Sequence, residues 1–283
     1  MWPLERAWRL VATAVLYGVF GLGSVVLAVF VVIPLRVFLA GAPERRARAW
    51  RAVVRRAFAA LVALAGKLGV FTVTFHNVEG LAAPGQLIIA NHPSLLDVVI
   101  LMSVIDDVDC VVKRQLSRNP FAAWQVALAE YVSNDNPEAV VAECARRLDA
   151  GRRMIIFPEG TRTRRGRPLH FLRGTARTIL ATSAPVRPVL VHCTPHSLAK
   201  GDPWWHIPPT RIRYVIEVGE PLDVADFRES VLPEPVRARR LTRWLEQWFS
   251  ARLEPRPRPA QAARAAPPGG FAASGRANPG RSR

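Results

Sequence analysis

The sequence predicts an α/β protein: a mixed sheet flanked by helices, preceded by an N-terminal hydrophobic helical segment that anchors the chain to a membrane. Three observations carry this prediction. Short apolar runs alternate with helical segments between about residues 72 and 220. A long uncharged run precedes them. Finally, 50% of the 283 residues are hydrophobic, which excludes a wholly disordered chain and supplies material for a core.

The anchoring segment is the run from residue 10 to residue 35, whose 26 residues include no charged side chain. A helix of this length extends roughly 39 Å, more than the roughly 30 Å hydrocarbon core of a bilayer. A buried core helix is disfavoured because no face of the run is charged. A secretory signal peptide is excluded because the run is too long and Arg36 separates it from the small residues that resemble a cleavage site.

The basic residues around this run set its expected orientation. Six arginines at residues 45–56 follow the run, whereas only Arg6 and Arg9 precede it, and Glu5 offsets one of their charges. The positive-inside rule therefore places the chain after residue 36 on the cytoplasmic face of the cell inner membrane. A second apolar stretch, 57–71, is too short to span and is expected at the interface or against the first helix. Whether the first helix spans or bends back stays open. The arginines that follow the run are Arg45, Arg46, Arg48, Arg51, Arg55 and Arg56.

The elements of the α/β part follow from the apolar pattern along the chain. Strands are predicted at 72–76, 86–90, 109–113, 154–157, 186–192 and 211–218, and helices at 95–105, 120–129, 137–150 and 174–182. No Walker loop is present, and no G-x-G-x-x-G follows a predicted strand. Nucleotide-binding classes therefore lose their main support.

The C-terminal part reads as an amphipathic helix at 236–253, followed by a tail rich in Pro, Ala, Gly and Arg that is expected to be disordered. Apolar residues in the helix recur at helical spacing, which favours packing on the domain over membrane contact. For the pair Trp204 and Trp205, burial and a position at the lipid headgroups both stay open. The predicted organisation is an anchor at 1–71, an α/β domain at 72–253 and a tail at 254–283.

Charge and cysteine content narrow the class of partner. The 39 basic and 22 acidic residues give a net charge of +17, which suggests an anionic partner such as nucleic acid, a membrane surface, a phosphorylated substrate or an acidic carrier protein. The cysteines Cys110, Cys144 and Cys193 form no disulfide framework and no C-x-x-C metal motif, so a reducing compartment is expected.

Two polar segments follow predicted buried strands, where α/β proteins place their sites. The first runs Asn91-His92-Pro93-Ser94-Leu95-Leu96-Asp97, and the second runs Phe157-Pro158-Glu159-Gly160-Thr161-Arg162-Thr163-Arg164. A histidine in the turn before a helix, with an aspartate in its first turns, can act as a general base. Alone, such a pair is most often accidental, and the arginines alone would be a solvated cluster. A zinc site lacks a third ligand, and Ser94 is in no G-x-S-x-G elbow.

Together the two segments resemble the lysophospholipid acyltransferase family, whose best-known members are 1-acylglycerol-3-phosphate acyltransferases. The family's NHxxxxD and FPEGTR motifs match Asn91–Asp97 and Phe157–Arg162 in the same order. Stretches at 111–120 and 186–189 resemble its K-x-x-L…P and V-x-P-V segments. The resemblance implies membrane phospholipid biosynthesis, with His92, oriented by Asp97, taking a proton from an acceptor hydroxyl that attacks an acyl thioester. It implies no metal and no cofactor beyond acyl-CoA or acyl-acyl carrier protein as co-substrate.

The resemblance also implies which residues contact the substrates, with Arg162 as the candidate phosphate ligand. The implied partners are membrane lipids, the anionic acyl donor and a lysophospholipid acceptor, and no specific nucleic acid is expected. The candidate substrate-binding residues are Asn91, Ser94, Lys113, Glu159, Gly160, Thr161, Arg162, Arg164 and Arg173.

Departures from the family pattern leave the acceptor open. Where glycerol-phosphate enzymes carry G-x-I-F-I-x-R, residues 129–135 end in Asp135, and a carboxylate there repels phosphate unless Lys113, Arg164 or Arg173 compensates. Gln115 and the 171–174 segment also depart from the pattern. Lysophosphatidate, giving phosphatidate, is the favoured acceptor, and an ornithine-type lyso-lipid, a glycolipid or another specialised lipid is the alternative. A basic nucleic-acid-binding protein and a non-catalytic membrane scaffold are the competitors from other classes, although no nucleic-acid module is recognised.

Overall fold

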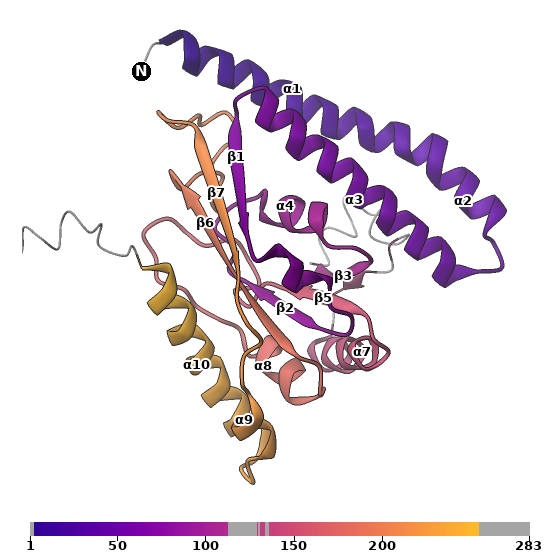
Figure 1. Cartoon of the computed structure of the whole chain (residues 1–283), viewed down its shortest axis with the longest axis vertical. Coiled ribbons are helices and arrows are strands. Elements are labelled where there is room, and N and C mark those ends of the chain that lie inside the picture. The colour runs from indigo at the N-terminus through magenta and orange to yellow at the C-terminus, as the bar shows by residue number, and fades with distance from the viewer. Residues whose placement is uncertain (1–2, 113–128, 130, 134–135, 255–283) are drawn as a thin grey trace, which may run out of the picture. The chain divides into compact units, whose positions relative to one another are not determined.

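The computed structural model describes residues 3–112, 129, 131–133 and 136–254. By its contacts the chain divides into a compact unit, Met1–Leu253, and a second unit, Glu254–Arg283. The first unit joins a helical hairpin to a layered α/β body (Figure 1). From residue 255 onward, the tail predicted to be disordered lies outside the described residues, as do all of the predicted helix 120–129 except Ala129.

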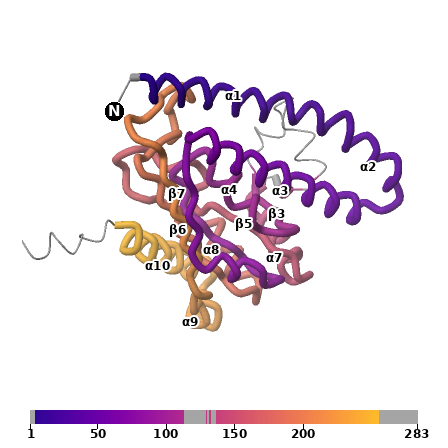
Figure 2. Tube along the Cα trace, turned by 45° about the horizontal axis from the view of Figure 1, so that its top comes forward, coloured from indigo at the N-terminus to yellow at the C-terminus, as the bar shows by residue number. Residues whose placement is uncertain are grey.

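The N-terminal apolar run forms one long helical arm that turns back on itself. Helix α1 (Pro3–Leu27) continues through a π-helical turn (Ala28–Val32) into α2 (Ile33–Phe38). Pro34 explains the π turn, because proline has no N–H and its ring crowds the carbonyl four residues earlier. After a turn, α3 (Pro43–Lys67) runs back beside α1 (Figure 2). The helix from Leu4 to Phe38 is long and apolar enough to cross a membrane.

Helix α3 differs from the helix predicted at 57–71. It begins at Pro43 and so contains the arginine-rich segment, and it ends at Lys67. Proline suits a first helical turn, and Gly69, with φ of 75°, terminates the helix. Phe71 belongs instead to the first strand.

The sheet contains the six predicted strands and one that was not predicted. Its spatial order is β1-β7-β6-β2-β5-β3-β4. Only the β6–β7 pair is antiparallel among the strand pairs that the structure describes, so the sheet is mixed, as expected. The unpredicted strand, β4, has two residues. The strands are β1 (Phe71–His76), β2 (Leu87–Ala90), β3 (Val108–Val112), β4 (Val132–Ser133), β5 (Arg153–Ile156), β6 (Val186–Thr194) and β7 (Ile212–Val218).

Helices cover both faces of this sheet, and β2 shows how the two cores divide. Ile88 and Ala90 belong to a core shared with the hairpin and α4 (Asp97–Val104), whereas Leu87 and Ile89 belong to the opposite core. All four residues are buried, as the alternation of a central strand requires. The opposite core includes residues of α7 (Pro137–Asp149), α8 (Arg173–Leu180) and α10 (Glu234–Leu253).

The amphipathic C-terminal helix packs on the domain, as predicted. In α10, Leu241, Leu245 and Phe249 are buried in the core. The structure also describes two short elements, a 3₁₀-helix (Val78–Ala82) and α9 (Ala225–Glu229).

Charged contacts attach the arginine-rich half of α3 to the α/β body. Arg51 is buried and donates from Nε to Asp107 at 2.7 Å and from Nη1 to the carbonyl of Ala129 at 3.0 Å. Arg55 pairs with Asp106 at 2.6 Å. These arginines therefore hold the first half of α3 against the residues that immediately precede β3.

Candidate active site

The two motif segments meet where neighbouring parallel strands end. Strand β2 pairs with β5, so the residues that follow Ala90 and Ile156 emerge side by side at one edge of the sheet. The imidazole of His92 lies on the ring of Phe157, with ring centres 4.4 Å apart. Sequence reasoning expected this convergence, and the structure brings the two segments into direct contact.

His92 and Asp97 form a hydrogen-bonded pair. His92 lies in the turn before α4, and Asp97 is the first residue of that helix. The distance from His92 Nδ1 to Asp97 Oδ2 is 2.9 Å, and the Ser94 backbone N–H donates to the same oxygen at 2.7 Å. An ionised carboxylate only accepts hydrogen bonds, so the proton lies on Nδ1, and Nε2 keeps a lone pair.

Burial distinguishes the two members of this pair. The Asp97 side chain is fully buried, whereas 15% of the His92 side chain is exposed. Burial raises the pKa of Asp97, and its hydrogen bonds to His92 and Ser94 act in the opposite direction. The helix N-terminus at Asp97 also favours the carboxylate. The pair therefore has the geometry of a general base with a fixed tautomer.

Glu159 fastens the two segments together. Its Oε1 accepts the His92 backbone N–H at 2.8 Å, and its Oε2 accepts the Thr163 hydroxyl at 2.7 Å. The Thr163 backbone N–H in turn donates to the His92 carbonyl at 2.7 Å. The Glu159 side chain is buried, and burial raises its pKa against the effect of these hydrogen bonds. Its carboxylate thus points into the protein.

Asn91 and Ser94 also lie behind the site, although both were expected to contact substrate. The Asn91 amide donates to the carbonyl of Val191 at 2.9 Å and accepts the N–H of Val191 at 2.8 Å, which extends the pairing of β2 with β6 by one side chain. Ser94 is fully buried, with Oγ 2.7 Å from the Tyr214 hydroxyl. Buried and bonded within the protein, neither side chain is available to a substrate in this structure.

Gly160 and Thr161 form the turn of the second segment. Gly160 has φ of 61°, and a Cβ there would lie 2.5 Å from Cδ1 of Leu172. Backbone conformation and space therefore both favour glycine. The N–H of Leu172 donates to the carbonyl of Pro158 at 2.8 Å, which holds the turn closed. Thr161 is half-buried in this turn.

The candidate phosphate-binding arginines differ in how firmly they are held. Arg162 is half-buried and donates from Nη1 to the carbonyls of Leu198 and Ala199 at 2.9 and 3.2 Å. Arg164 and Arg173 are exposed. Lys113, Gln115 and Asp135 lie outside the described residues.

An apolar cavity of about 190 Å³ adjoins the first motif segment. Its walls come from α1, α3, the start of α4 and the loop after β6, and they include Leu95, Leu96 and Leu198. Tyr17 of α1 also lines it and contacts the ring of Trp204, with ring centres 5.5 Å apart. The positive charge of Arg162 opposes the rise that burial causes in the pKa of Tyr17.

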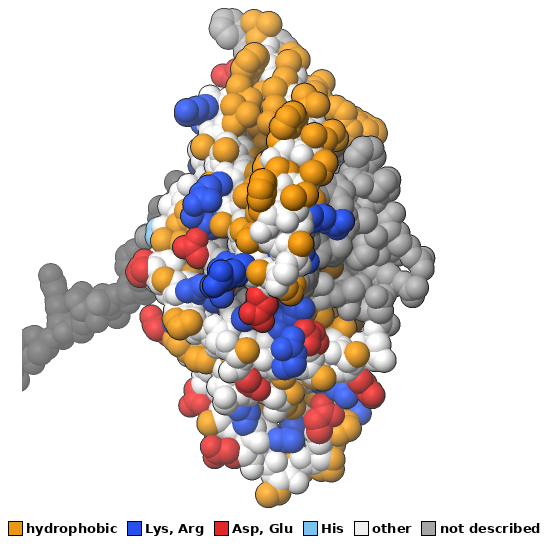
Figure 3. All heavy atoms as spheres, turned by 90° about the vertical axis from the view of Figure 1, so that its right-hand side faces the viewer, with side chains coloured by type: hydrophobic (Ala, Val, Ile, Leu, Met, Phe, Trp, Pro, Cys, Tyr) orange, Lys and Arg blue, Asp and Glu red, His pale blue; other side chains and the backbone are white. Residues whose placement is uncertain are grey.

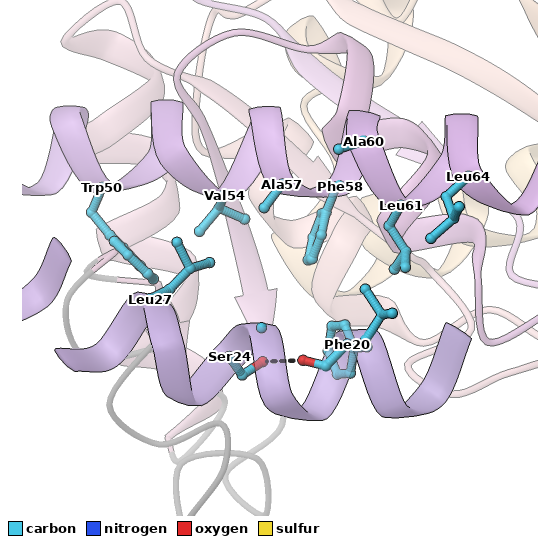
Figure 4. Close-up of a pocket in the computed structure, with 12 residues that line it drawn as sticks. Phe20, Ser24, Leu27, Trp50, Val54, Ala57, Phe58, Ala60, Leu61 and Leu64 are labelled. Atoms are coloured by element: carbon cyan, nitrogen blue, oxygen red, sulfur yellow. Dashed lines mark hydrogen bonds between the residues drawn. The ribbon is translucent and has the colours of Figure 1, made fainter. Parts of the chain in front are cut away.

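A second cavity, of about 180 Å³, lies between α1 and α3 (Figure 4). Phe20 and Leu61 line both cavities. Its lining also includes Val54, Phe58 and Leu64, which project from α3 toward α1. The hydroxyl of Ser24 is turned back to the carbonyl of Phe20 at 2.8 Å, so the space between the helices is apolar.

Sequence reasoning assigned no role in the site to Tyr17 or Tyr214. Tyr17 stands in a long apolar run and Tyr214 at a buried position of an alternating strand, and both patterns are typical of ordinary core. Only the fold brings α1 and β7 to the motif segments, so no local signal distinguishes these tyrosines.

Comparison with known proteins gives consistent matches. A family model described as Acyltransferase matches residues 72–192, which include both motif segments. A 1-acyl-sn-glycerol-3-phosphate acyltransferase from Cocos nucifera is 28% identical over 148 residues, which are 50% of this chain and 47% of that protein. The enzyme of that name from Helicobacter pylori is 30% identical over 105 residues, or 34% and 44% of the two chains. A Pseudomonas aeruginosa relative of the same name is 28% identical over 119 residues, or 40% and 46%. The chain thus spans less than half the length of these curated relatives.

Among solved structures, the chain is similar to the crystal structure of the 1-acyl-sn-glycerophosphate (LPA) acyltransferase, PlsC, from Thermotoga maritima. The TM-score is 0.60 at 22% sequence identity, and the match covers 88% of this chain and 98% of the other. This likeness extends over nearly the whole of that structure, so the two proteins share a fold.

Proposed function

We propose that this chain, which is similar to 1-acyl-sn-glycerol-3-phosphate acyltransferases, transfers a fatty acyl group from an acyl thioester to the hydroxyl of 1-acylglycerol-3-phosphate, giving phosphatidate. The observation that carries this proposal is the His92–Asp97 pair, held by Glu159 beside an apolar cavity. A base next to an apolar cavity suits acyl transfer between lipid substrates.

In the proposed mechanism, Nε2 of His92 accepts the proton of the acceptor hydroxyl while its oxygen attacks the thioester carbonyl carbon. Asp97 stabilises the imidazolium that forms, because Nδ1 already donates to Oδ2. The tetrahedral intermediate then collapses, the C–S bond breaks, and the departing sulfur takes the proton back from His92. The products are an ester and a free thiol.

Arg162 is the proposed ligand of the acceptor phosphate. Its Nη1 is engaged by two carbonyls, but within the described residues no hydrogen-bond acceptor is found for Nε or Nη2. A guanidinium fixed through one nitrogen is pre-organised to bind a phosphate through the others. Arg164, two residues later in the chain, and Arg173 are both exposed and add positive charge to the surface.

The hairpin supports a membrane-bound enzyme whose anchor lies in the plane of the membrane. Large apolar side chains are exposed along α1 and α2, with Leu22 69%, Phe30 71% and Phe38 83% exposed. Figure 3 shows hydrophobic side chains gathered in the upper part of one face, with arginine and lysine side chains below them. Insertion tip first would bury the arginines at the start of α3, two of which pair with Asp106 and Asp107.

An in-plane hairpin leaves the α/β part on one side of the bilayer, which we propose is the cytoplasmic side of the inner membrane. Trp8 and Arg9 support this arrangement, because they bond the start of α1 to the carbonyls of Leu68 and Pro209 at 2.9 Å each. The acyl donor then arrives from water as acyl-CoA or acyl-acyl carrier protein, and the acceptor arrives from the lipid.

The test uses membranes containing the wild-type chain or its His92→Ala variant, with each donor supplied separately. Lysophosphatidate, other lysophospholipids and ornithine-type lyso-lipids are offered together, and products are read by mass spectrometry. Phosphatidate that forms only with His92 supports the proposal. A His92-dependent product from another acceptor would retain acyl transfer and replace the acceptor. No product from folded protein would refute the proposed function.

A further inference from the structure

Two buried hydroxyl groups meet directly beneath the His92–Asp97 pair. Ser94 Oγ and the Tyr214 hydroxyl are 2.7 Å apart. Ser94 is 0% exposed and Tyr214 is 1% exposed. Ser94 belongs to the turn between His92 and Asp97, whereas Tyr214 comes from β7 on another part of the sheet.

The position of Tyr214 is fixed by the sheet. Strand β7 lies between β1 and β6, and the Tyr214 ring packs edge-on against Phe71 of β1, with centres 5.5 Å apart at an angle of 81°. Burial holds the pKa of the Tyr214 hydroxyl well above its ordinary value, so the group stays protonated and can donate a hydrogen bond. A rigid strand thus presents one hydroxyl to the motif turn.

Ser94 connects this hydroxyl to Asp97 through its backbone. The Ser94 N–H donates to Asp97 Oδ2, the same oxygen that receives His92 Nδ1. The other oxygen, Oδ1, is buried and has no hydrogen-bond partner among the described residues. The placement of the carboxylate against His92 therefore depends on where the Ser94 peptide is held.

We propose that Tyr214 is a positioning residue for the reaction: through Ser94, its hydroxyl holds the Ser94 N–H on the aspartate oxygen that orients His92. This inference rests on the proposed acyltransferase function. Tyr214 touches neither substrate nor the reacting atoms. Its contribution is to kcat, because it fixes the direction of the His92 ring.

A purely structural hydroxyl pair would behave differently. Replacing both partners of a buried hydrogen bond by apolar groups of similar shape is nearly neutral for stability. A Tyr214→Phe/Ser94→Ala double variant of a merely structural pair would therefore keep both fold and activity. If the pair positions Asp97, the double variant keeps its fold and loses activity.

Thr242 provides a control. Its hydroxyl is also buried and donates to the carbonyl of Ala238 at 2.7 Å within α10. Thr242→Val therefore removes one buried hydroxyl hydrogen bond without touching the motif turn.

The experiment measures kcat, KM for both substrates and the unfolding temperature of the full-length chain. Wild type, Tyr214→Phe, Ser94→Ala, the double variant and Thr242→Val are compared. We expect about a tenfold lower kcat for each single variant at Tyr214 or Ser94, since small misplacements of a base are costly. KM should stay within about twofold. The double variant should be less impaired than the product of the singles, because both break one link.

Wild-type kcat in Tyr214→Phe, a loss confined to KM, or an equal loss in Thr242→Val would overturn the inference while leaving the proposed function intact. A wild-type chain that acylates no acceptor would instead remove the proposed function, and this inference with it.

Discussion

Substitutions of Glu159 test whether this residue holds the site together or binds substrate. The structure commits both carboxylate oxygens to protein donors, at 2.8 Å from the His92 N–H and at 2.7 Å from the Thr163 hydroxyl. The two donors respond differently when the carboxylate is replaced. A hydroxyl can rotate to accept from an amide, whereas a backbone N–H can only donate. Glu159→Gln, which keeps an acceptor for the His92 N–H, should therefore be much more stable and more active than Glu159→Ala, which keeps none.

The magnitudes follow from these contacts. In Glu159→Gln, the amide oxygen can still accept from His92, and the amide nitrogen can donate to the Thr163 hydroxyl. The loss is then about 1 kcal/mol, for the change from charged to neutral hydrogen bonds. In Glu159→Ala, a buried N–H and a hydroxyl lose their acceptor, which costs about 3 kcal/mol. For a unit of this size, unfolding temperatures should fall by about 2–4 °C and about 6–12 °C.

Activity should follow the same order. We expect a modest decrease in kcat for Glu159→Gln and roughly a hundredfold decrease for Glu159→Ala, because the His92 backbone is no longer fixed. KM for the acceptor should be unchanged in Glu159→Gln. The assay is steady-state kinetics with thermal unfolding of the same preparations, and Glu220→Gln, 92% exposed, is the matched control. A large rise in acceptor KM, with kcat and unfolding temperature unchanged, would show that Glu159 contacts substrate and refute this reasoning.

Three further predictions concern Asp97 and Gly160. Asp97→Asn should lower kcat by about a hundredfold or more, because an amide oxygen in place of Oδ2 still accepts from His92 Nδ1 and the Ser94 N–H but carries no charge to stabilise the imidazolium. Kinetics and thermal unfolding of one preparation would show a loss of kcat much larger than any loss of stability explains. Burial raises the pKa of Asp97 above its ordinary 3.8, so this group stabilises the fold fully below 3.8 and that contribution is lost as pH rises through the folded-state pKa. Activity should have the opposite pH dependence, because the proposed mechanism requires the Asp97 carboxylate. As pH falls in the acid range, kcat should therefore decrease while this contribution to stability increases. Parallel pH profiles of kcat and of the free energy of unfolding would contradict the prediction. Gly160 has φ of 61°, and a Cβ there would lie 2.5 Å from Leu172 Cδ1, so Gly160→Ala should lower the free energy of unfolding by about 2 kcal/mol. Denaturant unfolding should show that adding Leu172→Ala relieves the steric clash but not the backbone strain, so stability is recovered only in part.

The elements that could be predicted from sequence are those whose pattern depends on neighbouring residues alone. Strand β2 (Leu87–Ala90) is apolar throughout because both of its faces are covered, and such a run can be read without tertiary information. The start of α3 cannot be read this way. Its first half is rich in arginine, and it is held by Asp106 and Asp107, which lie about fifty residues later in the chain. A hydrophobic pattern alone therefore places the helix too late.

The same distinction applies to the site. His92 and Asp97 could be paired from sequence because they are five residues apart and a turn before a helix brings them together. The partners of Asn91 and Ser94 are Val191 and Tyr214, which only the sheet order brings near. In this structure Asn91 and Ser94, which the sequence predicts to contact substrate, therefore bond to the protein itself.

The central claim, that His92 is the base of an acyl transfer between two substrates, is tested most directly by coupled product measurement. Free thiol release and phosphatidate formation are followed together in wild type and His92→Gln at matched unfolding temperature. The account predicts equal amounts of thiol and phosphatidate in wild type, and a loss of both of more than about a thousandfold in the variant. Phosphatidate formation by folded His92→Gln at the wild-type rate would contradict it.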